Sequence, residues 1–251
     1  MSTILKAVDV KKAYSIDHRQ QEVLKGIHLE IQKGDFTVIM GSSGAGKSTL
    51  LYALSGMDYI SSGKIIFNGE EIENFSPDKM AVFRREHCGF VFQQNNLLDS
   101  MSILDNVVAA GMLCNKSKKK VLEKAAGMFK KVNLSKEIQK KFPGQVSGGE
   151  AQRAGIVRAL INDPDVVFAD EPTGSLDYSN GQVVLDLLTA IHKSGQSIIM
   201  VTHDIRSAFR GNKIIFVRDG LIGGICDIGE YDEEDHARKE KLRSFLEERG
   251  W

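Results

Sequence analysis

The stretch Phe36-Thr37-Val38-Ile39-Met40-Gly41-Ser42-Ser43-Gly44-Ala45-Gly46-Lys47-Ser48 decides the fold of this chain. It opens with a short β-prone run, and the residues after Lys47 are good helix formers. The glycines between them permit a sharp turn that points backbone N–H groups inward, and the following helix adds its positive end. The stretch therefore predicts a P-loop that holds nucleotide phosphates between a strand and a helix, rather than a merely flexible loop.

Two later strands are predicted to end in polar side chains. Residues 165–171 read as a strand buried on both faces, and it ends in Asp170 and Glu171. Asp170 suits Mg²⁺, and Glu171 suits the orientation or deprotonation of an attacking water. Residues 197–201 form another core-type strand, which is followed by His203. Because ligands lie beyond the carboxyl ends of parallel strands, we expect these side chains and the P-loop to meet at one sheet edge.

A second glycine-rich stretch, Ser147-Gly148-Gly149-Glu150, precedes a helical pattern over Ala151–Ile161. Ser147 as an N-cap, together with two glycine N–H groups, would make an anion-binding helix start. The alternative is a plain Gly-Gly turn. The stretch resembles the signature loop of ATP-binding-cassette (ABC) ATPases. That resemblance implies a head-to-tail pair of chains, with two ATP molecules held between the P-loop of one copy and the signature loop of the other.

Other parts of the chain match the same family in order. Tyr14 resembles the aromatic residue that stacks on adenine, Gln93 resembles the Q-loop glutamine that touches Mg²⁺, and Asp177 resembles the D-loop aspartate that crosses the dimer interface. The resemblance implies three catalytic residues, namely Lys47, Glu171 and His203, and three Mg²⁺ ligands, namely Ser48, Gln93 and Asp170. The implied ATP-binding residues are Tyr14, Gly41, Ser42, Ser43, Gly44, Ala45, Gly46, Lys47, Ser48, Thr49, Gln93, Ser147, Gly148, Gly149 and Asp177.

Within the family, residues 168–177 and 95–98 resemble the subgroup of macrolide-efflux, lipoprotein-release and bacitracin-type peptide-resistance ATPases. This resemblance implies that ATP hydrolysis by this chain powers a separate membrane permease, its partner, for export or for mechanotransmission. The charged tail that ends in Trp251 favours the peptide-resistance branch. Departures from the family pattern are small: Val146 replaces a leucine, Ala45 replaces a serine, and Gly155 lies inside a predicted helix.

Composition agrees with one globular unit, with 251 residues of which 42% are hydrophobic. Lys plus Arg and Asp plus Glu both number 33, so no overall charge attracts nucleic acid, and we expect no nucleic-acid partner. The scattered Cys88, Cys114 and Cys226 lack metal-site spacing and suit a reducing cytosol. No signal peptide or membrane-spanning run is recognised. We therefore expect a cytoplasmic protein that reaches the inner face of the membrane through its permease.

The predicted fold class is α/β, a P-loop NTPase of the ABC type with a mixed, largely parallel core sheet. An antiparallel β portion is expected over residues 1–35, with strands at Ile4–Val10 and Ile27–Ile31, and a small helical subdomain at about 94–163. Asn68-Gly69 is a typical hairpin turn. The ATPase domain is expected to span 1–228, and 229–251 an acidic segment and a helix that packs on the core through Leu242, Phe245 and Leu246.

Three alternatives remain open at this level. A cell-division-type ABC ATPase with a related permease is poorly separated by sequence. A soluble ABC ATPase that acts on DNA or ribosomes is a rival class, and a small-molecule kinase would leave the signature loop unexplained. The basic run Lys116–Lys120 could bind anionic lipid or nucleic acid, but a solvated helix face is the simpler interpretation.

Overall fold

The structure is a computed structural model that describes residues 2–16 and 19–251. The chain forms two compact units. The first comprises Met1–Met80 and Ser194–Trp251, and the second comprises Ala81–Lys193. Each unit is built from segments that carry residues of the predicted site.

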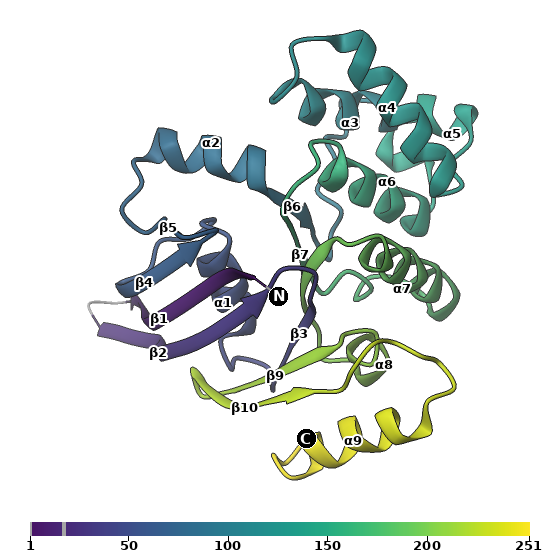
Figure 1. Cartoon of the computed structure of the whole chain (residues 1–251). Helices are drawn as coiled ribbons and strands as arrows, with labels where there is room; N and C mark the ends of the chain where they lie inside the picture. Colours follow the sequence, from purple (N-terminus) through teal and green to yellow (C-terminus); the bar gives the residue numbers. More distant parts are fainter. Residues whose placement is uncertain (1, 17–18) are drawn as a thin grey trace. The chain divides into compact units, whose positions relative to one another are not determined.

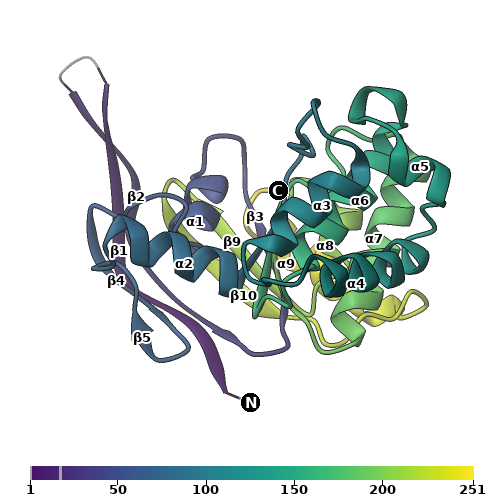
Figure 2. The same cartoon turned by 90° about the horizontal axis from the view of Figure 1, so that it is seen from above.

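The first unit contains an antiparallel sheet with strand order β2-β1-β4-β5. Its strands are β1 (Thr3–Ile16), β2 (Arg19–Gln32), β4 (Ser62–Phe67) and β5 (Glu70–Glu71). β1 and β2 pair along their length as a long ribbon (Figure 2). Both are longer than the predicted Ile4–Val10 and Ile27–Ile31, because the mostly polar residues that extend the ribbon are held by cross-strand backbone bonds and carry no apolar pattern.

The predicted Asn68-Gly69 turn is confirmed. Phe67 pairs with Glu70, so the loop between β4 and β5 has two residues. Both have positive φ, 49° at Asn68 and 86° at Gly69. This backbone belongs to the type I′ turn, whose twist matches that of the paired strands.

The first unit also contains a second sheet built around β3 (Phe36–Met40). β3 pairs in parallel with β8 (Ser197–Val201) on one side and with β9 (Lys213–Arg218) on the other, and β10 (Leu221–Asp227) pairs antiparallel to β9. Every residue of β3 and β8 is buried, as their continuous apolar runs predict. Helix α1 (Lys47–Leu54) follows β3, and α8 (Ile205–Ala208) follows β8.

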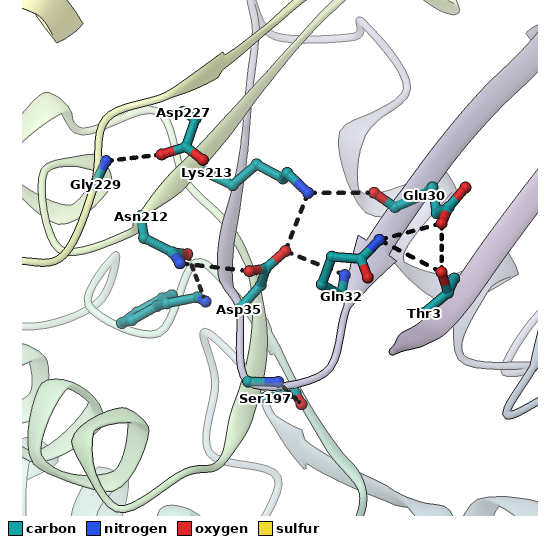
Figure 3. Close-up of polar contacts among 11 residues, drawn as sticks. Thr3, Glu30, Gln32, Asp35, Ser197, Asn212, Lys213, Asp227 and Gly229 are labelled. Carbon is teal, nitrogen blue, oxygen red and sulfur yellow. Dashed lines mark hydrogen bonds and ion pairs between the residues drawn. The ribbon is translucent and has the colours of Figure 1, made fainter. Parts of the chain in front are cut away.

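A polar network ties together the amino ends of β3, β8 and β9 (Figure 3). The Asp35 carboxylate accepts hydrogen bonds from the Gln32 N–H and the Lys213 ammonium, each at 3.1 Å. Asn212 Oδ1 accepts from the Phe36 N–H at 2.8 Å, and Ser197 Oγ accepts from the Gly34 N–H at 2.9 Å. These bonds fix the amino ends of the three strands relative to one another. The P-loop after β3 and His203 after β8 follow the opposite ends of these strands.

The carboxyl-terminal helix α9 (His236–Glu247) belongs to the first unit and lies along β10 (Figure 1). The predicted apolar stripe of this helix is confirmed, since Leu242, Phe245 and Leu246 are all buried. Arg238 is only 3% exposed, and it donates to the carbonyl oxygens of Phe209 at 2.7 Å and of Gly211. These bonds from a buried guanidinium tie α9 to the segment after α8.

The second unit combines a parallel strand pair with a group of helices (Figure 1). The strands are β6 (Cys88–Val91), which follows α2 (Pro77–His87), and β7 (Val166–Asp170). The helices are α3 (Ile103–Met112), α4 (Lys118–Lys131), α5 (Lys136–Lys140), the 3₁₀ turn Pro143–Gln145, α6 (Gly148–Leu160) and α7 (Tyr178–Lys193). α3 to α6 share an apolar core that includes Phe129 and Val157. A serine caps the start of each, at Ser102, Ser117, Ser135 and Ser147.

One predicted buried face differs from the structure. From sequence alone, the apolar residues of α7 predict a helix buried on one face, and they are Val183, Val184, Leu187, Leu188 and Ile191. Val183 is 44% exposed, whereas Leu185 is buried beside Val184 and Leu188. The buried face of α7 therefore includes Leu185 and excludes Val183.

Throughout residues 2–16 and 19–251, each helix is too short or too polar to span a bilayer.

Candidate nucleotide-binding site

The P-loop lies between β3 and α1, as predicted. Its glycines all have positive φ, 151° at Gly41, 77° at Gly44 and 98° at Gly46. A Cβ at Gly41 would lie 2.1 Å from the Val217 carbonyl oxygen, so only glycine fits there. Lys47 is 8% exposed, and its ammonium donates to the Ser42 carbonyl oxygen at 2.9 Å. The loop therefore combines a buried lysine ammonium with a curved backbone segment that suits a phosphate group.

His203 lies at the same edge of its sheet as the P-loop. β3 and β8 are parallel, with Ile39 opposite Val201, and the Thr202 N–H donates to the Ile39 carbonyl oxygen at 3.2 Å. The next residue, Asp204, is the N-cap of α8 and accepts from the Ser207 hydroxyl at 2.9 Å. Burial opposes ionisation of Asp204, but the hydrogen bonds from Ser207 and Arg206 outweigh it and lower the pKa of this carboxyl. The backbone on both sides of His203 is thus fixed.

Tyr14 is held by two residues that the sequence analysis did not identify. Its hydroxyl donates to Asp58 Oδ2 at 2.7 Å, and the Lys12 ammonium donates to Asp58 Oδ1 at 2.7 Å. Lys12 also lies 4.7 Å from the centre of the Tyr14 ring. Partial burial, followed by the Asp58 carboxylate, raises the pKa of Tyr14. The ring is 38% exposed, so an oriented aromatic surface remains for a base to stack on.

In the second unit, Gln93 and Glu171 follow the adjacent ends of β6 and β7, where Val91 pairs with Ala169. Glu171 has φ of 44°, a left-handed conformation that a glutamate rarely adopts. Its carbonyl oxygen accepts from the Gly174 N–H at 2.9 Å, which closes a tight turn. A Cβ at Gly174 would lie 2.9 Å from Gln93 Nε2. The structure therefore brings Gln93 close to the turn that begins at Glu171 and follows Asp170.

The signature loop forms a self-capped helix start. Ser147 is the N-cap of α6, and its hydroxyl oxygen accepts from the Glu150 N–H at 3.2 Å. In return, Glu150 Oε2 accepts from the Ser147 N–H at 2.8 Å, and this bond lowers the pKa of Glu150. The helix begins at Gly148, directly after the expected N-cap Ser147, so the glycine pair forms its first turn ahead of the apolar pattern over Ala151–Ile161. The Ser147 and Glu150 pair is a capping box.

Asn180 connects the signature loop to Asp177, and sequence reasoning missed it. A Cβ at Gly149 would lie 2.3 Å from Asn180 Oδ1. The Asn180 side-chain amide donates to Asp177 Oδ2 at 2.6 Å, and its backbone N–H donates to Asp177 Oδ1 at 3.0 Å. The backbone bond from Asn180 is the main cause that lowers the pKa of Asp177. Gly149, Asn180 and Asp177 therefore form one contact group, which no local pattern marks.

The predicted Mg²⁺ ligands have suitable chemistry. A hydroxyl (Ser48), an amide oxygen (Gln93) and a carboxylate (Asp170) are hard oxygen donors, and magnesium combines few such groups with waters and substrate phosphates. Ser48 belongs to the first unit, whereas Gln93 and Asp170 belong to the second. No group of three or more His, Cys, Asp or Glu side chains that could hold a metal occurs among the described residues.

Comparison with known proteins identifies the family. The ABC transporter family matches residues 24–174. The chain is 40% identical over 226 residues to the macrolide export ATP-binding/permease protein MacB of Hyphomonas neptunium, covering 90% of this chain but 35% of that protein. It is 40% identical to the bacitracin export ATP-binding protein BceA of Halalkalibacterium halodurans, covering 87% of each. It is 38% identical to the lipoprotein-releasing system ATP-binding protein LolD of Aquifex aeolicus, covering 89% of this chain and 98% of that one.

A solved structure gives the same result. The dimeric post-hydrolysis state of the ATP-binding cassette MJ0796 bound to ADP and Pi has a TM-score of 0.83 and 32% identity, and covers 89% of this chain and 98% of that one. The predicted family, its fold class and its subgroup are confirmed by these findings. The dimer expected from the resemblance agrees with the dimeric state of this solved cassette, and the expected permease agrees with the name of MacB.

Proposed function

This chain belongs to the ABC transporter family as one of its ATP-hydrolysing cassettes, and we propose that two copies of it power a separate membrane permease. The observation that carries the proposal is the presence of two different phosphate-directed helix starts in one chain. The first is the glycine-rich loop from Gly41 to Lys47, whose lysine donates to the loop backbone. The second has the glycine pair Gly148 and Gly149 in the first turn of α6. A single nucleotide occupies the first, so the second serves the nucleotide of the other copy.

In this proposal each chain binds ATP through its own P-loop. Tyr14 stacks on adenine, the backbone from Gly41 to Thr49 surrounds the phosphates, and the Lys47 ammonium neutralises part of their charge. Ser48, Gln93 and Asp170 would hold Mg²⁺, which would supply charge neutralisation at the phosphates. The other copy contributes Ser147, Gly148, Gly149 and Asp177, which close the dimer.

Glu171 and His203 act on the attacking water. Glu171 orients it or accepts its proton, from a left-handed backbone position directly after β7. His203 donates a hydrogen bond toward the γ-phosphate or the water, from a backbone fixed by β8 and Asp204. Loss of the γ-phosphate removes the ligand shared by the two copies, so the dimer opens and its motion drives the permease.

The finer assignment is to export or mechanotransmission in antimicrobial-peptide resistance, or to lipoprotein release. The names of MacB, BceA and LolD support this range, and the 87% mutual coverage with BceA supports a cassette that is separate from its permease. The chain would then lie in the cytoplasm, at the inner face of the membrane.

The central test is Glu171→Gln. We expect at least a hundredfold loss of ATP turnover, and a stable dimer on a sizing column only when ATP is present. Glu123→Gln, the same change on the exposed side of α4, is the control and should leave both properties unchanged. Unchanged turnover in Glu171→Gln would remove Glu171 from its role, and a chain that stays monomeric with ATP would contradict the shared site.

The partner can be tested by purification from membranes. The tagged chain should copurify with an integral-membrane permease in mild detergent. Recovery of ribosomes or DNA in place of a permease would favour the rival soluble class.

A further inference from the structure

Helix α6 holds the Q-loop segment at both ends. Near its start, Gln152 is 1% exposed, and its side-chain amide donates to the Phe92 and Pro172 carbonyl oxygens, each at 2.8 Å. Two turns later, the Arg158 guanidinium donates to the Asn95 carbonyl oxygen at 2.7 Å and to the Asn96 carbonyl oxygen at 2.5 Å. The short segment that carries Gln93 is therefore attached to one helix on both sides.

The attachment is firm for physical reasons. The two amide hydrogens of Gln152 are both used, and a buried carbonyl that loses its donor is costly. Burial lowers the pKa of Arg158, and the hydrogen bonds of its guanidinium to two backbone carbonyl oxygens offset part of the cost of burying the charge. The Ser175 hydroxyl adds a further bond to the same segment, to the Gln93 carbonyl oxygen at 2.7 Å. The segment 92–96 cannot shift without breaking bonds to α6 or to the turn after β7.

The same bonds reach the turn that follows Glu171. Pro172 is the next residue after Glu171, and its carbonyl oxygen shares the Gln152 amide with that of Phe92. One buried side chain thus joins the segment before Gln93 to the segment after Glu171. Residues 93 and 171 are far apart in sequence, and the two hydrogen bonds of Gln152 link the backbone beside each of them.

The start of α6 carries the signature loop. The helix runs without interruption from Gly148 to Leu160, a length of roughly 20 Å at 1.5 Å per residue. Its first turn is fixed by the capping box of Ser147 and Glu150. A displacement or rotation of the signature loop is therefore transmitted to Gln152 and Arg158 as a rigid movement.

We infer that Gln152 and Arg158 are positioning residues that transmit the state of the signature loop to Gln93 and Glu171. The inference rests on the proposed function, because the partner's nucleotide is what engages the signature loop. When that loop closes on the nucleotide of the other copy, α6 sets the Q-loop glutamine and the catalytic glutamate together. Closure and water activation are thereby coupled within one chain.

The test measures hydrogen exchange at residues 92–96, with and without ATP, in the Glu171→Gln background. The Gln152→Leu variant keeps a similar volume but has no donor. The matched control is Gln139→Leu, since Gln139 donates to the Leu134 carbonyl oxygen at 3.0 Å on α5, away from the site. We expect ATP to slow exchange at 92–96 in the parent and in the control at least fivefold more than in Gln152→Leu.

Three outcomes are decisive. A dimer that forms with equal ATP-dependent protection in Gln152→Leu would overturn the inference and leave the proposed function intact. A parent that shows no ATP-dependent dimer would overturn the proposed function, and the inference with it. A dimer with protection lost only in Gln152→Leu supports the inference.

Steady-state kinetics add an independent readout with Glu171 restored. Gln152→Leu should lower kcat about tenfold while KM for ATP stays within twofold, because the P-loop is untouched. Arg158→Lys keeps the charge but loses the planar guanidinium that donates to two carbonyl oxygens. It should also lower kcat with little change in KM, by a smaller factor, and it replaces Gln152→Leu if that variant does not fold. A loss confined to KM, or none in either variant, would contradict a positioning role.

Discussion

The two glycine-rich helix starts of this chain are built in opposite ways. At α1 the N-cap is Gly46, no side chain caps it, and its first turn contains Lys47 and no acid. At α6 the N-cap is Ser147, which exchanges two hydrogen bonds with Glu150 in the first turn. The first start relies on cationic and backbone groups, whereas the second supplies its own cap and its own negative charge.

This difference in capping indicates what each loop needs from a bound phosphate. An uncapped helix start with a lysine beneath it favours an anion strongly, so the P-loop should gain most of its stability from bound nucleotide. A start with a capping box is already satisfied, so the signature loop can stay folded in a lone chain and meet a partner's phosphate without rearrangement. The following variants test this contrast in order of expected effect.

The largest effect is expected from Gly41→Ala. The new Cβ would lie 2.1 Å from the Val217 carbonyl oxygen, so β9 or the loop must move, and we expect a loss of about 3 kcal/mol or more in the free energy of unfolding. Thermal denaturation and ATP binding measure it. Gly34→Ala, where φ is +86° and nothing lies within 4 Å, is the control and should cost only roughly 1–2 kcal/mol. Equal costs would mean that the close approach at Gly41 is unimportant.

Ser147→Ala is expected to act on both stability and turnover. Loss of the N-cap should cost about 1 kcal/mol without nucleotide, and ATP turnover should fall at least tenfold because the loop meets the partner's phosphate. Ser135→Ala removes the N-cap of α5 and is the matched control, with a similar loss of stability and normal turnover. If turnover falls equally in both variants, the effect of Ser147 is only structural.

Glu150 gives the contrast a pH dependence. Its pKa is lowered from 4.5 in the folded chain by the bond from the Ser147 N–H. A lowered folded pKa contributes stability above the unfolded value, and that contribution is lost as the pH falls through the folded pKa. The difference in unfolding free energy between the wild type and Glu150→Gln should therefore shrink as the pH is lowered below 4.5, as urea denaturation can measure. A difference that is constant or grows on acidification would exclude a stabilising role for the ionised Glu150 carboxylate in the capping box.

The smallest effects should come from glycines inside helices. A Cβ at Gly155 of α6 would meet Asn95 at 3.8 Å, an ordinary contact, and one at Gly127 of α4 would meet nothing within 4 Å. Each substitution by alanine should stabilise the chain by about 0.5–1 kcal/mol in chemical denaturation. Gly149→Ala, in contact with Asn180, should destabilise it, so the requirement for glycine in α6 would be limited to the loop.

Local sequence determined much of the fold. The strands at 36–40 and 197–201, the α1 start and the Asn68-Gly69 turn follow from apolar runs and glycine conformations that act within a few residues. The limits of β1 and β2 could not be predicted, because cross-strand pairing extends a strand past the end of its apolar pattern.

The same division holds for the candidate site. Motif spacing was enough to identify the segments that carry Lys47, Glu171 and Ser147. The residues that hold the predicted site residues, such as Lys12 beside Tyr14, Gln152 beside the Gln93 segment and Asn180 beside Gly149, have ordinary local contexts. Only the packing of distant segments brings these pairs into contact. Sequence by itself determined which chemistry the loops carry, because backbone conformation and charge are local properties. The tertiary structure alone decided what holds them in place, because burial and hydrogen bonding depend on neighbours that the chain order does not reveal.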